Sequence, residues 1–254
     1  MRLVSLCPSL TELIYDLGMG DALVGRTKFC VHPADRVGQV ETLGGTKNPK
    51  IARIAALAPD LVLMNEEENR LEDARALISA GVRVHVSMPR TAVETAFMVR
   101  TIAAELGVAQ AGEPIARDIE QRADRVRTAS RGLAVVPYAY LIWREPWMTV
   151  SQDTFIAELL GMAGGVNVFG DATDRYPTVS LDALDERGPQ SVLLASEPFP
   201  FDQRHVVELA ERLAWPVSRF VLVDGELLSW HGSRTPRGID YAELVIASIR
   251  GKQH

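Results

Sequence analysis

The sequence predicts an α/β fold of two similar lobes, each built on a mostly parallel sheet. Residues 9–25 and 54–63 predict, in order, a helix, a glycine stop, a short strand, a second helix, a Pro turn and a buried strand. Residues 153–170 and 181–194 repeat this order in the second half of the chain. Strands that alternate with helices favour a parallel sheet covered on both faces. Two lobes form a cleft, where ligands commonly bind.

The first lobe is predicted to span residues 1–90. Apolar runs predict four strands, at residues 2–6, 23–25, 61–64 and 82–86. Helical spacing predicts three helices, two that begin at Pro8 and Pro49 and one over residues 71–80. Ser9 and Glu12 have the spacing of a capping box, so Ser9 is expected to cap the first helix.

Residues 91–131 predict a mostly helical connection, because apolar residues recur there at helical spacing in a stretch rich in Ala, Glu and Arg. Two interpretations remain open: two surface helices, or one continuous or kinked helix that joins both lobes. Residues 132–254 predict the second lobe. Its expected strands are 134–136, 139–143, 191–195 and 220–223, and its expected helices are 155–160, 205–213 and 239–249.

Composition limits the class of protein. The chain has 254 residues, 47% of them hydrophobic and 24% charged, which is typical of a globular protein large enough for two cores. A net charge of −6 argues against a nucleic-acid partner. No apolar run approaches the roughly 18 residues of a membrane span. Residues 1–6 already predict a strand rather than a secretory signal, which favours a cytoplasmic location or a trimmed chain.

No set of residues completes a metal or redox motif. Cys7 and Cys30 are far apart in the sequence, so buried free thiols are expected, with a disulfide as the alternative. His85 lies in an apolar strand, where a packed neutral ring is expected. A metal site made of His32, His231 and a carboxylate such as Glu197 is an alternative. The favoured interpretation of His231 is a polar contact in the cleft, or an axial ligand to a metal inside an organic cofactor.

Enzyme motifs are also incomplete. The chain has no G-x-S-x-G, no H-E-x-x-H, and no G-x-G-x-x-G after the first strand. Residues 20–27 resemble a phosphate-binding loop but have Arg where Lys is required and follow a helix. We therefore expect a binding protein rather than an enzyme. A cytoplasmic enzyme or chaperone that acts on a cofactor precursor is the alternative from another class.

Aromatic and polar side chains gather where strands of the second lobe are predicted to end, in residues 143–148, 174–177, 196–201 and 224–234. These segments contain three of the four tryptophans, and aromatic faces beside a few polar groups suit a large, flat, mostly uncharged ligand. Residues 27–33 and 64–69 take the matching positions in the first lobe. The predicted ligand-binding residues are Phe29, His32, Trp143, Arg144, Trp147, Tyr176, Glu197, Phe199, Trp230, His231 and Arg234.

Nearly the whole chain resembles the helical-backbone, or class III, periplasmic binding proteins for cobalamin and iron-siderophores, through residues 5–12, 54–63 and 164–169. It is most similar to the cobalamin-type branch of ABC importer binding proteins, through residues 143–150, 196–201 and 224–230. The resemblance implies two Rossmann-like lobes joined by a long backbone helix. It also implies a corrinoid held in the cleft and delivered to an ATP-driven importer.

The resemblance has further implications for partners and location. It implies a carboxylate on each lobe that binds arginines of the permease. Glu66, Glu72 and Asp202 are the named candidates, and Glu67, Glu68 and Glu197 are alternatives. It implies a periplasmic location, in contrast to the expectation from residues 1–6. We expect a monomer that requires no cofactor and takes cobalamin or a related corrinoid as its ligand. A ferric-siderophore or metal-ion binding protein is the alternative, but it would require a more basic cleft.

Overall fold

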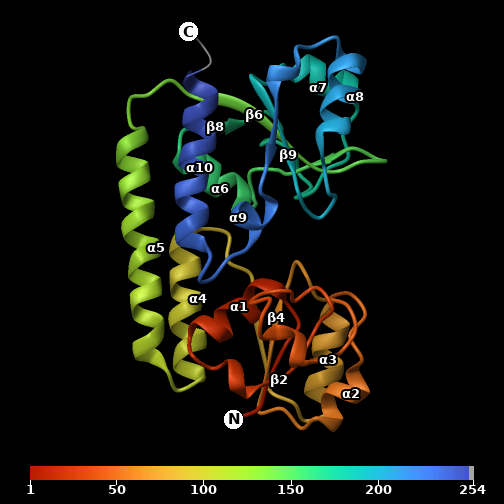
Figure 1. The fold of residues 1–254 in the computed structure, drawn as a ribbon, viewed down its shortest axis with the longest axis vertical. Coiled ribbons are helices and arrows are strands. Elements are labelled where there is room, and N and C mark those ends of the chain that lie inside the picture. The colour runs from red at the N-terminus through yellow and green to blue at the C-terminus, as the bar shows by residue number, and fades with distance from the viewer. Residues whose placement is uncertain (252–254) are drawn as a thin grey trace. The chain divides into compact units, whose positions relative to one another are not determined.

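The computed structural model describes residues 1–251 and divides into two α/β units (Figure 1). The first unit comprises residues 1–89, 93–118 and 231–234. The second comprises residues 90–92, 119–230 and those from 235 onward. The short segment 231–234 therefore belongs to the first unit although the chain on both sides of it belongs to the second.

The first unit contains five parallel strands in the order β3-β2-β1-β4-β5. Leu43, Ile54, Val62 and Leu77 belong to its buried core, which explains why the apolar runs and helical spacing located most of its elements. The strands are β1 (Leu3–Ser5), β2 (Leu23–Arg26), β3 (Glu41–Thr42), β4 (Leu61–Asn65) and β5 (Val84–Ser87). The helices are α1 (Pro8–Asp16), α2 (Ile51–Ala56) and α3 (Leu71–Ser79), with short 3-10 turns at Gly20–Ala22 and Val37–Gln39.

The predicted capping box at α1 is wrong. Cys7 takes the N-cap position without a side-chain cap, and Pro8 begins the helix, where its missing N–H costs nothing. Ser9 therefore lies inside the helix, and the Glu12 carboxylate binds Arg234 instead. Both cysteines are buried free thiols, as expected, and burial raises the pKa of Cys7 to about 12.

The sheet of the second unit is centred on β6 (Val136–Trp143). The strand β9 (Ser191–Ala195) pairs with one edge of β6 and β10 (Phe220–Val223) pairs with β9, all parallel. On the other edge, β8 (Gly165–Asn167) pairs parallel with the start of β6 and β7 (Met148–Thr149) pairs antiparallel with its end. The helices are α6 (Phe155–Met162), α7 (Leu181–Arg187), α8 (Gln203–Leu213), α9 (Gly225–Ser229) and α10 (Thr235–Arg250), and Val217–Arg219 form a 3-10 turn.

Two helices occupy the predicted connection between the lobes. Helix α4 (Ala92–Glu105) ends before Gly107, whose φ of 74° is in the left-handed region that glycine adopts readily. Helix α5 (Ala109–Ser130) begins in the first unit and ends in the second. The predicted fold class, an α/β protein of two mostly parallel sheets, is confirmed.

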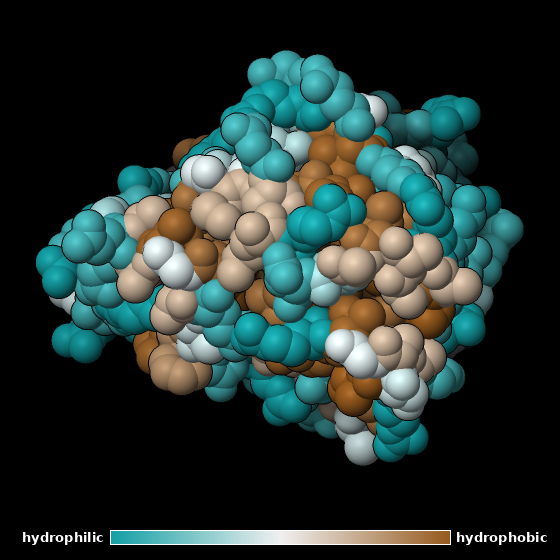
Figure 2. Space-filling model, turned by 90° about the horizontal axis from the view of Figure 1, so that it is seen from below, coloured by the Kyte–Doolittle hydropathy of each residue, from teal (hydrophilic) through white to brown (hydrophobic). Residues whose placement is uncertain are grey.

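The surface seen from below in Figure 2 mixes hydrophobic and hydrophilic residues. Brown groups of hydrophobic residues are separated by teal hydrophilic side chains on this face. Among the described residues, no helix combines the length and the apolar character that a bilayer crossing requires.

A glycine in α10 allows close backbone packing in the second unit. A Cβ atom added at Gly238 would overlap the carbonyl oxygen of Leu227 in α9. Because backbone atoms cannot move aside easily, Gly238→Ala is expected to destabilise the protein by about 2–3 kcal/mol in urea unfolding. Gly161, near the end of α6, has open space where a Cβ atom would lie, so Gly161→Ala is the matched control. Equal unfolding midpoints for the two variants would contradict this packing argument.

Candidate functional site

A buried polar cluster lies where two strands of the first sheet end. Asn65 ends β4, and its Nδ2 donates to the Ser87 carbonyl at 2.9 Å and lies 3.3 Å from His231 Nε2. The Asn65 Oδ1 accepts the backbone N–H groups of Glu67 and Glu68. These bonds fix the orientation of the amide, so His231 Nε2 must accept the hydrogen bond that Asn65 Nδ2 donates.

His231 is consequently held as a neutral ring. Burial lowers its pKa to about 4, and the nearby Glu67 carboxylate opposes this effect only in part. Ser9 Oγ lies 3.4 Å from the same Nε2 atom. Since Nε2 is already engaged by Asn65 and Ser9, the geometry does not support His231 as an axial ligand to a metal.

Arg234 is also engaged within the first unit. Its guanidinium donates two hydrogen bonds of 2.7 Å to the two carboxylate oxygens of Glu12. Only 8% of the Arg234 side chain and 17% of the Glu12 side chain are exposed. Arg234 therefore has a structural partner, although the sequence predicted it as a ligand contact.

The loop after β2 exposes an aromatic ring in the first unit. Phe29 is 50% exposed, and the Nζ atom of Lys28 lies 4.9 Å from the centre of its ring. The adjacent Cys30 is fully buried, and its Sγ accepts a hydrogen bond from the Thr11 hydroxyl at 2.9 Å. His32 follows in the same loop and is half-buried. The buried thiol thus anchors a loop in which the Phe29 ring is exposed.

An aromatic cluster forms in the second unit beyond the ends of β6 and β9. Trp143 is 39% exposed and meets Phe199 edge to face, with 5.8 Å between ring centres. Phe199 lies 4.7 Å from Phe201, whose ring stacks on Trp147 at 6.2 Å. The structure thus brings together three of the predicted ligand-binding residues, Trp143, Trp147 and Phe199, and adds Phe201.

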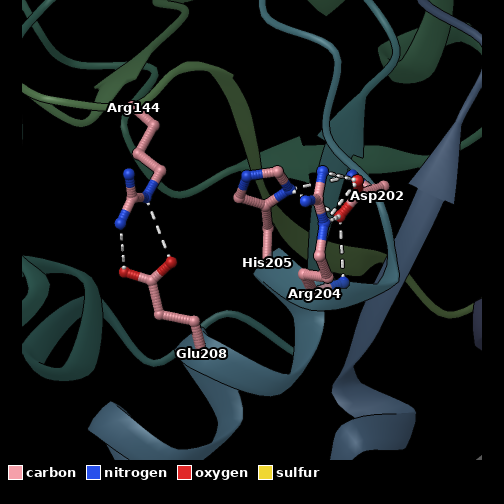
Figure 3. Close-up of polar contacts among 5 residues, drawn as sticks. All are labelled: Arg144, Asp202, Arg204, His205 and Glu208. Carbon is pink, nitrogen blue, oxygen red and sulfur yellow. Dashed lines mark hydrogen bonds and ion pairs between the residues drawn. The ribbon is translucent and has the colours of Figure 1, made fainter.

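Helix α8 contributes a charged partner to this cluster (Figure 3). Arg144 donates two hydrogen bonds of 3.0 Å to the carboxylate of Glu208 and also forms an ion pair with Glu145. The guanidinium lies 5.9 Å from the centre of the Trp147 ring. The hydrogen bonds from Arg144 lower the pKa of Glu208, so this carboxylate is ionised at neutral pH. Arg144 is therefore paired rather than open to an anionic ligand.

Trp230 and Glu197 form a second, separate pair in the same unit. The Trp230 Nε1 donates to Glu197 Oε1 at 2.6 Å, and the Ser229 hydroxyl donates to the same oxygen at 3.1 Å. Trp230 is 8% exposed, so most of its indole ring packs within the protein. Tyr176, at the remaining predicted position, is 36% exposed, with the Arg175 guanidinium 6.0 Å from its ring centre.

The candidate docking carboxylates differ in their surroundings. Glu66 and Glu72 are exposed, the first directly after β4 and the second in the first turn of α3. Asp202 is the N-cap of α8, where it accepts the Arg204 backbone N–H and forms an ion pair with the Arg204 side chain. These bonds lower its pKa to about 2. Asp202 therefore has a structural role at the start of α8.

Metal-ligating side chains do not cluster in the part of the chain that the structure describes. Within residues 1–251, no group of three or more His, Cys, Asp and Glu side chains could hold a metal ion. The structure also shows that His85 is more than a packed ring, because its Nδ1 lies 3.1 Å from a Glu105 carboxylate oxygen.

Comparisons with known proteins agree with this architecture. A family model described as periplasmic binding protein matches residues 3–209. The chain belongs to this family. Among its relatives, a vitamin B12-binding protein of Vibrio cholerae is 25% identical over 254 aligned residues, which cover 98% of this chain and 89% of the relative. A vitamin B12-binding protein of Pectobacterium carotovorum is 26% identical over 199 residues, 78% of this chain and 72% of the relative.

Solved structures of similar proteins share the family fold. The periplasmic vitamin B12 binding protein BtuF of Vibrio cholerae superposes with a TM-score of 0.84 at 24% identity, covering 99% of this chain and 98% of BtuF. The periplasmic heme-binding protein RhuT from Roseiflexus has the same TM-score at 23% identity, with 98% of each chain covered. The predicted family is confirmed, and its vitamin B12-binding members agree with the predicted cobalamin-type branch.

Three residues that contact the aromatic cluster or its arginine were not predicted from the sequence: Phe201, His205 and Glu208. A signal for the last two was present, because His205 and Glu208 are three residues apart and therefore lie on one face of the predicted helix. Their partners lie in other loops, and the sequence does not indicate which loop a helix face will meet.

Proposed function

We propose that this protein is a non-enzymatic binding protein of the periplasm. It holds a corrinoid such as cobalamin and passes it to an ABC-type importer. The observation that carries the proposal is the aromatic cluster of the second unit, in which Trp143, the last residue of β6, meets edge to face with Phe199, which follows the neighbouring strand β9. Such a surface suits a large ligand with flat apolar faces. Vitamin B12-binding relatives that align over nearly the whole chain give independent support.

The arginines favour a corrinoid over heme or a ferric siderophore. Heme carries propionates and siderophores are often anionic, so a site for either needs cationic groups that can reach the ligand. Each arginine in the candidate loops is paired with a carboxylate of its own unit: Arg144 with Glu208, Arg175 with Asp153 and Arg234 with Glu12. A ligand with a periphery of uncharged amides fits these surroundings better.

We assign the remaining predicted contacts by their accessibility. Phe29 in the first unit and Tyr176 in the second are exposed enough to touch a ligand. Trp230 and Glu197 are better placed to shape the wall than to cover a large part of the ligand, because they bind each other. The cleft between lobes that the sequence predicted stays a prediction, and so does the monomeric state.

For the importer, we propose Glu66 and Glu72 as the docking carboxylates of the first unit, because both are exposed. Asp202 is the weaker candidate on the second unit, since its carboxylate already caps α8 and binds Arg204. The test is a pull-down of the permease. The double variant Glu66→Gln and Glu72→Gln is expected to recover less permease than the unmodified protein, whereas the control Glu94→Gln on α4 should recover as much.

The ligand is tested by titrating the purified protein with cyanocobalamin, hemin and a ferric siderophore, following tryptophan fluorescence and heat together. Saturable one-to-one binding of the corrinoid with a Kd of about 1 μM or lower is expected. Tighter binding of hemin than of cyanocobalamin would replace the corrinoid by heme in this proposal. Lack of binding to all three would favour an enzyme or a different ligand.

Trp143 gives the clearest single test of the ligand wall. Trp143→Ala is expected to weaken corrinoid binding by roughly tenfold or more, about 1.4 kcal/mol, because it removes a large aromatic face. Little loss of thermal stability is expected, since the ring is 39% exposed. Phe97→Ala on α4, where the ring is 70% exposed, is the matched control and should bind as the unmodified protein does. Equal affinities for the two variants would remove Trp143 from the site.

A further inference from the structure

The first two turns of α8 contact the segments that carry Trp143 and Phe199, two aromatic residues proposed above to bind the ligand. Glu208 binds Arg144, which lies between Trp143 and Trp147 in the loop after β6. His205, one turn earlier, packs its ring against Phe199 and Phe201 in the loop after β9. In Figure 3 both side chains project from the same helix, Glu208 toward Arg144 and His205 beside Asp202.

The bond between Glu208 and Arg144 fixes the first loop. The planar guanidinium meets both carboxylate oxygens, an arrangement that restricts the position of both side chains. A third charge, on Arg212 one turn along α8, lies 3.5 Å from the same carboxylate and holds it in place. Because Arg144 follows Trp143 directly in the chain, fixing Arg144 also restricts the backbone that carries the indole ring.

The ring of His205 supports the second loop. Its Nδ1 accepts the Asp202 backbone N–H at 3.0 Å, which sets the ring orientation at the start of α8. The ring then meets Phe199 at 5.1 Å and 79° and Phe201 at 5.4 Å and 87°, both edge to face. Phe199 in turn meets Trp143, so the two supports from α8 converge on the same pair of aromatic rings.

We propose that Glu208 and His205 are positioning residues that hold Trp143 and Phe199 in the orientation that binds the ligand. Neither needs to touch the ligand, because Glu208 acts through Arg144 and His205 acts through Phe199. This inference rests on the proposed function, since it assigns a role within that binding site. It also reassigns Arg144 from a ligand contact to a link between α8 and the first loop.

A double-mutant cycle tests whether Glu208 acts through Arg144. Glu208→Gln is expected to weaken cyanocobalamin binding roughly three- to tenfold, because the partly exposed ion pair is lost. Arg144→Gln should cause a similar loss, and the double variant should bind no more weakly than either single variant. Glu208→Asp, which keeps the charge, should recover part of the affinity. Glu211→Gln, on an exposed position of α8, is the control and should bind normally.

A second readout follows Trp143 without any ligand. With 5-fluorotryptophan in the protein, the Trp143 ¹⁹F resonance can be assigned from its absence in Trp143→Phe. Glu208→Gln and His205→Ala should shift or broaden this resonance, whereas Glu211→Gln should leave it unchanged. The Trp215 resonance serves as an internal reference, because the Trp215 indole contacts Asp185 and Arg219 and neither Glu208 nor Arg144.

The outcomes separate this inference from the proposed function. Normal affinity and an unchanged Trp143 resonance in Glu208→Gln would overturn the positioning role while the receptor function stands. Additive losses in the cycle would also overturn it, since Glu208 would then act independently of Arg144. If the unmodified protein binds no tested ligand, the proposed function fails, and the ¹⁹F spectra alone decide whether α8 orients Trp143.

Discussion

Arg234→Met is expected to lower the free energy of unfolding by about 3–5 kcal/mol, because it leaves a buried carboxylate without its partner. The guanidinium is almost entirely buried and supplies both hydrogen bonds to the Glu12 carboxylate. Without it, a carboxylate that is mostly removed from water has lost its main hydrogen-bonding and charge partner. Asp16, one turn along α1, adds to the cost because it lies close enough to repel Glu12 electrostatically.

An exposed pair of the same geometry provides the control. Arg53 donates two hydrogen bonds of 2.7 Å to Glu41, but 51% and 38% of their side chains are exposed. Arg53→Met should therefore cost less than about 1 kcal/mol in urea unfolding. The double variant Glu12→Gln and Arg234→Met should be more stable than Arg234→Met, because no unpaired charge remains buried. A cost for Arg234→Met no larger than that for Arg53→Met would contradict this account.

The fold could be predicted because its elements follow simple periodicities. The central strands β1, β4 and β9 are apolar runs that are buried on both faces, and the sequence located them to within a few residues. The missed strands lacked this signal. Both residues of β3 are exposed, and β7 is two residues long and antiparallel, so each is defined by a neighbouring strand rather than by its own residues.

The site could be predicted only in part, because the sequence indicates where a strand ends but not which distant residue a side chain will contact. Position after a strand end was enough to group Trp143, Trp147 and Phe199, because neighbouring parallel strands bring their carboxyl ends to one edge. Partners far away in the chain were not predictable. Arg144 and Glu208 are 64 residues apart and Glu12 and Arg234 are 222 residues apart, so only the folded chain shows that these arginines are paired.

The segment 231–234 shows most clearly how the predicted role of a residue can differ from its place in the folded chain. From the sequence, His231 and Arg234 were polar residues after the last strand and therefore candidates for ligand contact. In the structure both are buried in the first unit, where His231 meets Asn65 and Ser9 and Arg234 meets Glu12. We therefore interpret the polar residues of this segment as contributors to the stability of the first unit.

Acid should destabilise the buried, neutral His231, and the stability of the protein is expected to fall as the pH drops below about 6.5. An unfolded histidine has a pKa near 6.5, whereas burial lowers the pKa of His231 to about 4. The folded state therefore favours the neutral ring, and its stabilising contribution is complete above the unfolded pKa. Between these two values the unfolded chain binds a proton that the folded chain does not. The expected loss is about 2 kcal/mol by about pH 5 and about 3 kcal/mol near pH 4.

His231→Gln isolates this contribution from the other titrating groups. A glutamine carbonyl can accept the Asn65 hydrogen bond but carries no titratable proton, so the variant keeps the contact and loses the pH dependence. Neighbouring carboxylates such as Glu68, whose pKa is raised by burial, titrate in both proteins and cancel in the difference. Urea unfolding of both proteins at about pH 7 and about pH 5 measures that difference. Parallel stability curves over this range would show that His231 is not held neutral, and the hydrogen bond that Asn65 donates to its Nε2 would then be wrongly assigned.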